Sequence, residues 1–308
     1  MNGNLKNILI VGGLGYLGGR IVKYLCDQKY QVKVTTRKQS SEYPENVPVN
    51  CNIYTTNYDS TQELCELLSD VDCIIHLAGP DAHTHFINTE SLINAHVVLT
   101  EKLLHASRQC LVSKFIYLST IHVYGSNLKG IINEETKPLP EEPFSKAHYE
   151  AENIILSNKD NISKVILRCA NTFGAPYFDN EKCWKLVVNN FYKNAIETGV
   201  ITVKSPHTHR TFYPVSLLCK QIEGLIINDN FDGVFNVGEK ESISMMEMAQ
   251  RLKLTVNKNS NGKCKIDIIN SNATDIEKPF VLKSKLKNIS AIDLNQTYQI
   301  DITEFDNN

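Results

Sequence analysis

Short runs of apolar residues alternate along the chain with segments in which apolar residues recur every three or four positions. The runs are rich in leucine and β-branched residues and are apolar throughout, which is typical of parallel strands buried on both faces. The predicted strands are 7–11, 31–36, 51–54, 72–79, 114–120 and 165–169. The predicted helices are 20–26, 61–68, 91–110 and 144–157.

This repetition of strand and helix predicts an α/β fold with a Rossmann-like, doubly wound parallel sheet. Beyond residue 170 the alternation weakens, and the residues from 257 onward, rich in Asn, Lys and Ser, predict no definite element. The elements predicted in this half are helices 184–197, 215–227 and 244–252 and strands 200–203 and 234–237.

The first predicted strand leads into glycines spaced as Gly12, Gly15 and Gly18, followed by a helix. Residues without a Cβ let backbone N–H groups approach a pyrophosphate, and the helix N-terminus attracts the same anion. A strand, this spacing and a helix in one unit predict a dinucleotide site. We expect a dinucleotide-binding domain at 1–170, joined by 215–238, and a smaller C-terminal substrate-binding lobe at 171–214 and 239–308.

The end of the second predicted strand indicates which dinucleotide is bound. NAD sites usually carry an acidic residue there for the ribose hydroxyls, whereas this chain has Thr36 followed by Arg37 and Lys38. Without a carboxylate to repel a 2′-phosphate, and with two cations to attract it, the sequence favours NADP over NAD. The alternative is that Arg37 and Lys38 simply belong to a solvated loop.

Composition changes this picture little. The 308 residues carry a net charge of −2, with a pI near 6.5, so nothing favours nucleic acid or an anionic membrane as partner. The first strand begins close to the N-terminus and no apolar run approaches the length of a membrane span, so we expect neither a secretory signal nor a membrane anchor. The nine cysteines form no C-x-x-C pair, which favours a reduced, cytoplasmic protein.

With these residues in view, the sequence resembles the extended short-chain dehydrogenase/reductase family, which contains nucleotide-sugar epimerases, dehydratases and reductases. The matching landmarks span roughly residues 5 to 255 and are 12–18, 76–79, Asn94, 117–125, 167–174, 210–212 and 235–238. Together with the glycine motif, the resemblance assigns cofactor binding to Gly12, Gly15, Tyr16, Leu17, Gly18, Arg37, Lys38, Leu77, Ala78, Gly79, Ser119 and His148.

The resemblance also locates the catalytic residues, with one departure. Thr120 takes the place of the family hydroxyl that polarises the substrate carbonyl or alcohol, and Asn94 lies in the long helix. The family Tyr-x-x-x-Lys corresponds here to Phe144 and His148. A phenylalanine cannot exchange a proton, so His148, titrating near neutrality, is expected to act as general acid and to bond the ribose. Alternatively, Phe144 and His148 only pack, and the protein binds a dinucleotide without turnover.

Substrate contacts are expected from His83, His122, Asn171 and Arg210. By resemblance, Arg210 contacts the diphosphate of a nucleotide sugar and Asn171 faces its phosphates or ribose. The alternatives are that Arg210 is a surface residue, that Asn171 caps a turn, and that His122 lies in a surface loop. The pairs His83/His85 and His207/His209 each lack a nearby third ligand, so we expect no metal.

These features lead to one hypothesis and two alternatives. The hypothesis is an NADPH-dependent reductase of a keto intermediate in nucleotide-sugar biosynthesis. The alternatives are an epimerase or dehydratase that uses its cofactor transiently, and a catalytically silent NADP-binding sensor or partner protein. A homodimer formed through the helices at 91–110 and 144–157 is also expected from the resemblance.

Overall fold

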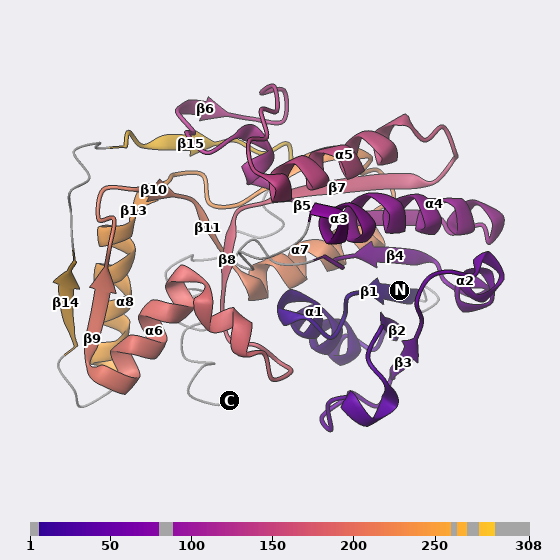
Figure 1. Cartoon of the computed structure of the whole chain (residues 1–308), viewed down its shortest axis with the longest axis horizontal. Helices are drawn as coiled ribbons and strands as arrows, with labels where there is room; N and C mark the ends of the chain where they lie inside the picture. The colour runs from indigo at the N-terminus through magenta and orange to yellow at the C-terminus, as the bar shows by residue number, and fades with distance from the viewer. Residues whose placement is uncertain (1–5, 80–88, 260–263, 270–276, 287–308) are drawn as a thin grey trace.

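The structure, a computed structural model, describes residues 6–79, 89–259, 264–269 and 277–286. Its centre is a parallel sheet of seven strands in the order β12-β7-β5-β4-β1-β2-β3 (Figure 1). The predicted α/β fold with a Rossmann-like parallel sheet is confirmed. The strands are β1 (Asn7–Val11), β2 (Gln31–Thr36), β3 (Cys51–Thr55), β4 (Cys73–His76), β5 (Lys114–Thr120), β7 (Ser163–Cys169) and β12 (Gly233–Val237).

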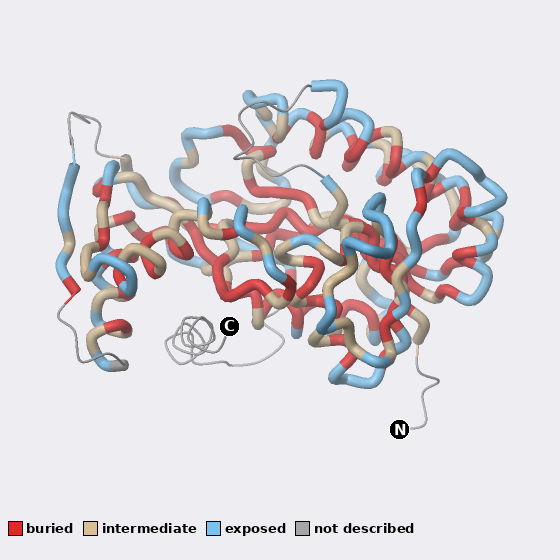
Figure 2. The backbone as a smooth tube through the Cα atoms, turned by 60° about the horizontal axis from the view of Figure 1, so that its bottom comes forward, coloured by how far each residue is buried: buried red, intermediate tan, exposed pale blue. Residues whose placement is uncertain are grey.

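Helices cover both faces of this sheet. One face is packed by α1 (Tyr16–Asp27) and α7 (Val215–Ile227), and the other by α2 (Thr61–Leu68), α4 (Leu99–Gln109) and α5 (Pro143–Ser157). The sheet strands and the inner faces of the helices are buried, whereas the outer faces of the helices are exposed (Figure 2). This two-sided cover explains why the strands are apolar at successive positions.

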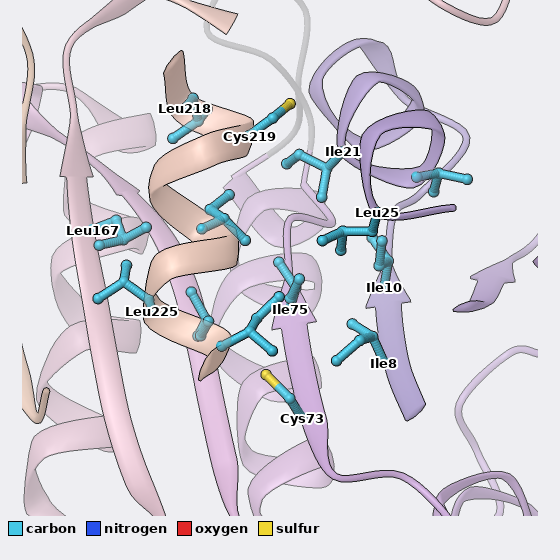
Figure 3. Packing of buried hydrophobic residues seen from close by; sticks show 14 of the residues in the cluster. Ile8, Ile10, Ile21, Leu25, Cys73, Ile75, Leu167, Leu218, Cys219 and Leu225 are labelled. Carbon is cyan, nitrogen blue, oxygen red and sulfur yellow. The ribbon is translucent and has the colours of Figure 1, made fainter. Parts of the chain in front are cut away.

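Side chains of β1 divide between the two faces according to the period of two in a strand. Ile8 and Ile10 pack with α1 and α7, and Leu9 packs with the helices of the opposite face. Figure 3 shows Ile8 and Ile10 close to Ile21 and Leu25 of α1. Burying one such side chain contributes about 1.5–3 kcal/mol, so this central strand is strongly stabilised.

The predicted helix 91–110 is interrupted. It consists of α3 (Thr89–Leu92), a π-helical segment η2 (Ile93–Val98) and α4. The amide of Leu99 donates to the carbonyl of Asn94, a bond with the wider spacing of a π-helix. His96 lies in this segment and is buried.

A second group of elements, at the left of Figure 1, has its own apolar core. Helices α6 (Val187–Thr198) and α8 (Met245–Asn259) pack on β9 (Val200–Val203), which pairs with β14 (Lys265–Ile268). The helix expected at 184–197 was wrong at its start, because η4 (Glu181–Lys185) is a 3-10 turn and Leu186 is extended. β14 comes from the C-terminal segment for which the sequence predicted nothing.

Three further short strand pairs occur among the described residues. They are β6 (Gly130–Ile132) with β15 (Phe280–Leu282), β8 (Asn171–Phe173) with β11 (Phe212–Pro214), and β10 (His209–Arg210) with β13 (Ile243–Ser244). β6 lies inside the segment 125–143 that was expected to be a loop. Since β12 pairs with β7 and α7 packs on α1, residues 215–237 lie with the sheet, while the boundaries of the two lobes stay a prediction.

Among the described residues, no helix is both long and apolar enough to cross a membrane.

Candidate functional site

The glycine loop lies where the strand order reverses, between β1 and β4, which is where α/β sheets bind their ligands. Gly12 has a φ of +87°, and a Cβ there would lie 2.8 Å from the amide nitrogen of Ala78. A Cβ on Gly18 would lie 2.3 Å from the carbonyl oxygen of Gly12. Only glycines therefore allow this close approach of the loop, the β4 turn and α1.

This arrangement fits the pyrophosphate of a dinucleotide. Gly15 precedes the first residue of α1, and its amide donates to the carbonyl of Gly12 at 3.1 Å. α1 begins at Tyr16 without a side-chain cap, so its first amides and its dipole are left to attract an anion. The Tyr16 hydroxyl donates to the carbonyl of Gly174 at 2.9 Å, and Leu17 packs against the core. We therefore expect Tyr16 and Leu17 to meet a pyrophosphate through their backbone amides.

The expected adenosine end lies at the exposed tip of β2. The hydroxyl of Thr36 accepts from the Lys38 amide at 3.1 Å, and the Lys38 carbonyl accepts from the Thr55 hydroxyl at 2.6 Å. These bonds fix the backbone of the tip, while the side chains of Arg37 and Lys38 are exposed. A 2′-phosphate placed here would meet two cations and no carboxylate at position 36.

Thr120 ends β5 at the same edge of the sheet. It is buried, and its hydroxyl oxygen accepts from the amide of His122 at 3.2 Å. This bond begins the 3-10 turn η3 (Ile121–Tyr124) and uses only a lone pair, so the O–H hydrogen of Thr120 is left to donate. The neighbouring Ser119 donates its hydroxyl to the buried carboxylate of Glu152, and its expected contact with the cofactor stays a prediction.

Beside Ser119 lies an ion pair that the sequence did not reveal. Glu152 of α5 and Arg168 of β7 are 0% and 4% exposed, and Arg168 Nη2 donates to Glu152 Oε2 at 2.6 Å. Arg168 Nε adds two bonds of 3.1 Å, and the Tyr124 ring lies 4.8 Å from the guanidinium. Burial disfavours the charged form of Arg168. The hydrogen bonds that Arg168 donates to Glu152, and the negative charge of that carboxylate, outweigh this effect and raise the pKa of Arg168. The pair joins α5 to the strand beside Thr120.

His148 lies in α5 one turn after Phe144, and the two rings are 4.5 Å apart between centroids. Its Nδ1 lies 2.9 Å from the hydroxyl of Tyr117. Burial, followed by the nearby His96, His76 and His122, holds the pKa of His148 well below its usual value. The expectation that His148 titrates near neutrality is therefore wrong, because burial disfavours the imidazolium. Its catalytic role stays a prediction.

His148 belongs to a buried cluster whose other members sequence reasoning missed, namely His76, His96 and Tyr117. His76 and Tyr117 are register partners on β4 and β5, and the Nδ1 of His96 lies 3.1 Å from the Tyr117 hydroxyl. Burial lowers the pKa of His76 to about 3 and that of His96 to about 4. The sequence did offer one signal for this cluster. His76 and Tyr117 are polar residues inside strands that were predicted to be buried on both faces.

Gly79 adjoins this cluster. A Cβ on Gly79 would lie 2.1 Å from the Cε1 of His96 and 2.3 Å from its Nε2. The glycine therefore provides the space for the His96 ring. The turn at Leu77 and Ala78 is held by the Leu77 amide, which donates to the carbonyl of Val11.

The expected substrate residues have varied surroundings. Asn171 donates its side-chain amide to the carbonyl of Thr211 at 3.2 Å, which holds β8 beside β11. Arg210 donates to the carbonyl of His209 at 2.7 Å and forms an ion pair of 3.1 Å with Glu277. Both bonds come from Nη1, so a diphosphate bound through the other N–H groups of Arg210 would lie beside that carboxylate.

Three candidate site residues remain, namely Asn94, His122 and His83. Asn94 is exposed on η2, and His122 is half-buried directly after Thr120. His83 lies outside the described residues. Within the described parts of the chain, no three His, Cys, Asp or Glu side chains gather so that they could hold a metal ion.

The chain is similar to known proteins in sequence and in structure. The model of the NAD dependent epimerase/dehydratase family matches residues 8–216. The chain is 25% identical over 265 residues to a dTDP-glucose 4,6-dehydratase of Streptomyces niveus, covering 80% of this chain and 76% of that protein. It is 26% identical over 265 residues to UDP-glucuronic acid decarboxylase 1 of Danio rerio, covering 82% and 61%. The solved structure of MoeE5 in complex with UDP-glucuronic acid and NAD shares the fold, with a TM-score of 0.78 at 17% identity over 98% and 99% of the two chains.

Proposed function

Since this chain belongs to the NAD-dependent epimerase/dehydratase family, we propose that it converts a nucleoside-diphosphate sugar as a dehydratase- or epimerase-type enzyme with bound NAD(P). The observation that carries the proposal is the Thr120 hydroxyl, which can donate at the same sheet edge as the glycine loop. The related proteins described above are a dehydratase and a decarboxylase, so this alternative now ranks above the reductase of a keto intermediate.

In this proposal the residues divide the work as follows. Gly12, Gly15 and Gly18 would let the pyrophosphate of NAD(P) approach the backbone, and the cofactor held there would supply hydride transfer. Thr120 donates to the reacting oxygen of the sugar and orients it. Phe144 exchanges no proton, so His148 is the side chain of α5 assigned to proton transfer.

We expect Thr120→Val to lower kcat by about 10²-fold, because the variant keeps the β-branched shape and removes the donor at the reacting oxygen. The assay supplies NAD or NADP with a panel of UDP- and dTDP-linked hexoses and follows the sugar products by NMR. Cofactor affinity, measured by calorimetry, should stay unchanged.

The matched control for this prediction is Thr198→Val, which removes a hydroxyl at the exposed end of α6. Wild-type turnover in Thr120→Val would contradict the assigned role. Binding of cofactor with no turnover of any sugar by the wild type would instead favour the silent NADP-binding protein, the candidate supported by Phe144.

The proposed preference for NADP rests on the β2 tip. Arg37→Ala is expected to weaken the binding of NADP by about tenfold relative to the binding of NAD. This change corresponds to the loss of one charge-assisted hydrogen bond of roughly 1.5 kcal/mol. The ratio of the two dissociation constants is measured by titration. Arg108→Ala, on the exposed side of α4, serves as the control and should leave the ratio unchanged. An equal ratio in Arg37→Ala and wild type would contradict the preference.

A homodimer and a cytoplasmic location stay predictions. The proposed dimer contact consists of the outer faces of α4 and α5, which line an open hollow with charged and apolar side chains. The residues around this hollow are Glu101, Leu104, His105, Arg108, Ile154, Asn158 and Asp160.

A further inference from the structure

We propose that His96, Tyr117 and His148 form a hydrogen-bonded relay that carries a proton between the substrate and solvent in place of the phenol missing at position 144. The inference rests on the proposed function, because it assigns proton transfer at the same site. His148 is the residue assigned to the substrate, and Tyr117 and His96 are positioning residues that act through it.

The geometry of the relay is continuous. The Tyr117 hydroxyl lies 3.1 Å from the Nδ1 of His96 and 2.9 Å from the Nδ1 of His148. The two imidazole rings lie 4.0 Å apart between centroids, and the three residues are 3%, 1% and 5% exposed in chain order. The hydroxyl of Tyr117 therefore bridges two rings from different helical segments.

The single hydrogen of that hydroxyl couples the two rings. Both bonds are satisfied when one Nδ1 donates to the Tyr117 oxygen and the other accepts its hydrogen. If both nitrogens donated, the buried phenol hydrogen would have no acceptor among the described residues. One ring consequently carries its hydrogen on Nδ1 and the other on Nε2.

Proton transfer along this chain needs no charged imidazole. The Nε2 of His148 takes a proton from a substrate hydroxyl as the hydride leaves its carbon. The Nδ1 hydrogen of His148 passes to the Tyr117 oxygen, whose own hydrogen passes to the Nδ1 of His96. The Nε2 hydrogen of His96 passes to water, and the reverse sequence returns a proton to the substrate. Each ring gains one hydrogen and loses one, which suits a pair that burial keeps neutral.

The outer end of the relay is Nε2 of His96. This atom is buried and has no hydrogen-bond partner among the described residues. It adjoins Gly79, where a Cβ would lie 2.3 Å from it and where the backbone is exposed. The Gly79 backbone covers this atom and is itself exposed, so the proposal assigns the exchange with water to this position. His76 packs against the Tyr117 ring at 5.3 Å but contributes no bond to the chain.

The first test does not depend on turnover. NMR of the ¹⁵N-labelled protein reports which ring nitrogen of each histidine carries the hydrogen, and spectra of His96→Gln and His148→Gln assign the signals. Opposite tautomers for His96 and His148 in the wild type, with the pairing lost in Tyr117→Phe, are the expected result. The same tautomer in both rings of the wild type would overturn the relay.

The second test measures proton transfer. Tyr117→Phe keeps the ring and removes the bridge, so kcat should fall by about 10²-fold with cofactor affinity and KM unchanged. The dependence of kcat on the D₂O fraction should be curved in the wild type, as several protons move, and linear in the variant. Tyr24→Phe is the matched control, because the Tyr24 hydroxyl donates to Glu223 at 2.6 Å on the other face of the sheet.

The outcomes separate the two proposals. Wild-type kcat in a folded Tyr117→Phe would overturn the relay and leave the proposed function intact. If Tyr117→Phe does not fold, His96→Gln is expected to show the same loss of kcat and decides in its place. If the wild type converts no nucleotide sugar, the proposed function fails, and the tautomers alone decide whether the two rings are coupled.

Discussion

Replacing Glu152 by glutamine is expected to lower the free energy of unfolding by about 3–5 kcal/mol, because it leaves the charge of Arg168 buried without its anion. The glutamine has nearly the same volume, so the loss reports electrostatics rather than a cavity. Three Arg168 bonds of 2.6 to 3.1 Å end on the Glu152 carboxylate, which is completely buried. Urea unfolding followed by circular dichroism measures the change.

Two further variants test this explanation. Removing both charges, in Glu152→Leu with Arg168→Met, should recover most of the lost stability because no buried charge is left unpaired. The exposed pair of Lys23 and Asp27 on α1 is the matched surface control, and Asp27→Asn should cost less than about 0.5 kcal/mol. A loss in Glu152→Gln as small as that of Asp27→Asn would contradict a stabilising role of the buried pair.

Acidification from pH 7 to pH 5 is expected to lower the free energy of unfolding by about 4 kcal/mol through His76 and His96 alone. Burial lowers their pKa values in the folded protein to about 3 and about 4, against an ordinary value of 6.5. Below pH 6.5 the unfolded chain binds more protons than the folded one, so stability is complete above that pH and falls as the pH drops. Each histidine contributes about 2 kcal/mol at pH 5, and His148 acts in the same direction.

Urea unfolding at several pH values measures this dependence. His76→Leu replaces a fully buried ring by an apolar side chain, and it should reduce the loss between pH 7 and pH 5 by about 2 kcal/mol. His105→Gln, on the exposed side of α4, removes a histidine outside the cluster and should leave the dependence as in the wild type. An unchanged pH dependence in His76→Leu would show that the buried ring is not responsible.

Agreement between sequence and structure was best where an element is defined by its neighbours along the chain. The strands at 7–11, 31–36 and 114–120 were predicted at the bounds that the structure gives. The segment at 130–132 was missed, because β6 forms only by pairing with β15, about 150 residues later in the chain. Short strands of this kind carry little pattern of their own, and a distant partner decides whether they form.

The sequence by itself determined the parallel sheet and the glycine loop. The apolar runs form strands whose successive side chains are buried on opposite faces of the sheet. The absence of a Cβ at Gly12 and Gly18 lets the glycine loop, the β4 turn and α1 lie close together. Both are consequences of local backbone geometry, which neighbouring residues specify.

Only the tertiary structure decided the surroundings of His148 and Arg168. The Tyr117 hydroxyl that bonds His148 is 31 residues away in sequence, and the Glu152 carboxylate that pairs with Arg168 is 16 residues away on another element. Desolvation and hydrogen bonding across elements set the charge of a buried side chain, and neither is encoded in its local pattern. The same histidine at 148 would titrate near neutrality in water, and it is the packing of α5 on β5 that keeps it neutral.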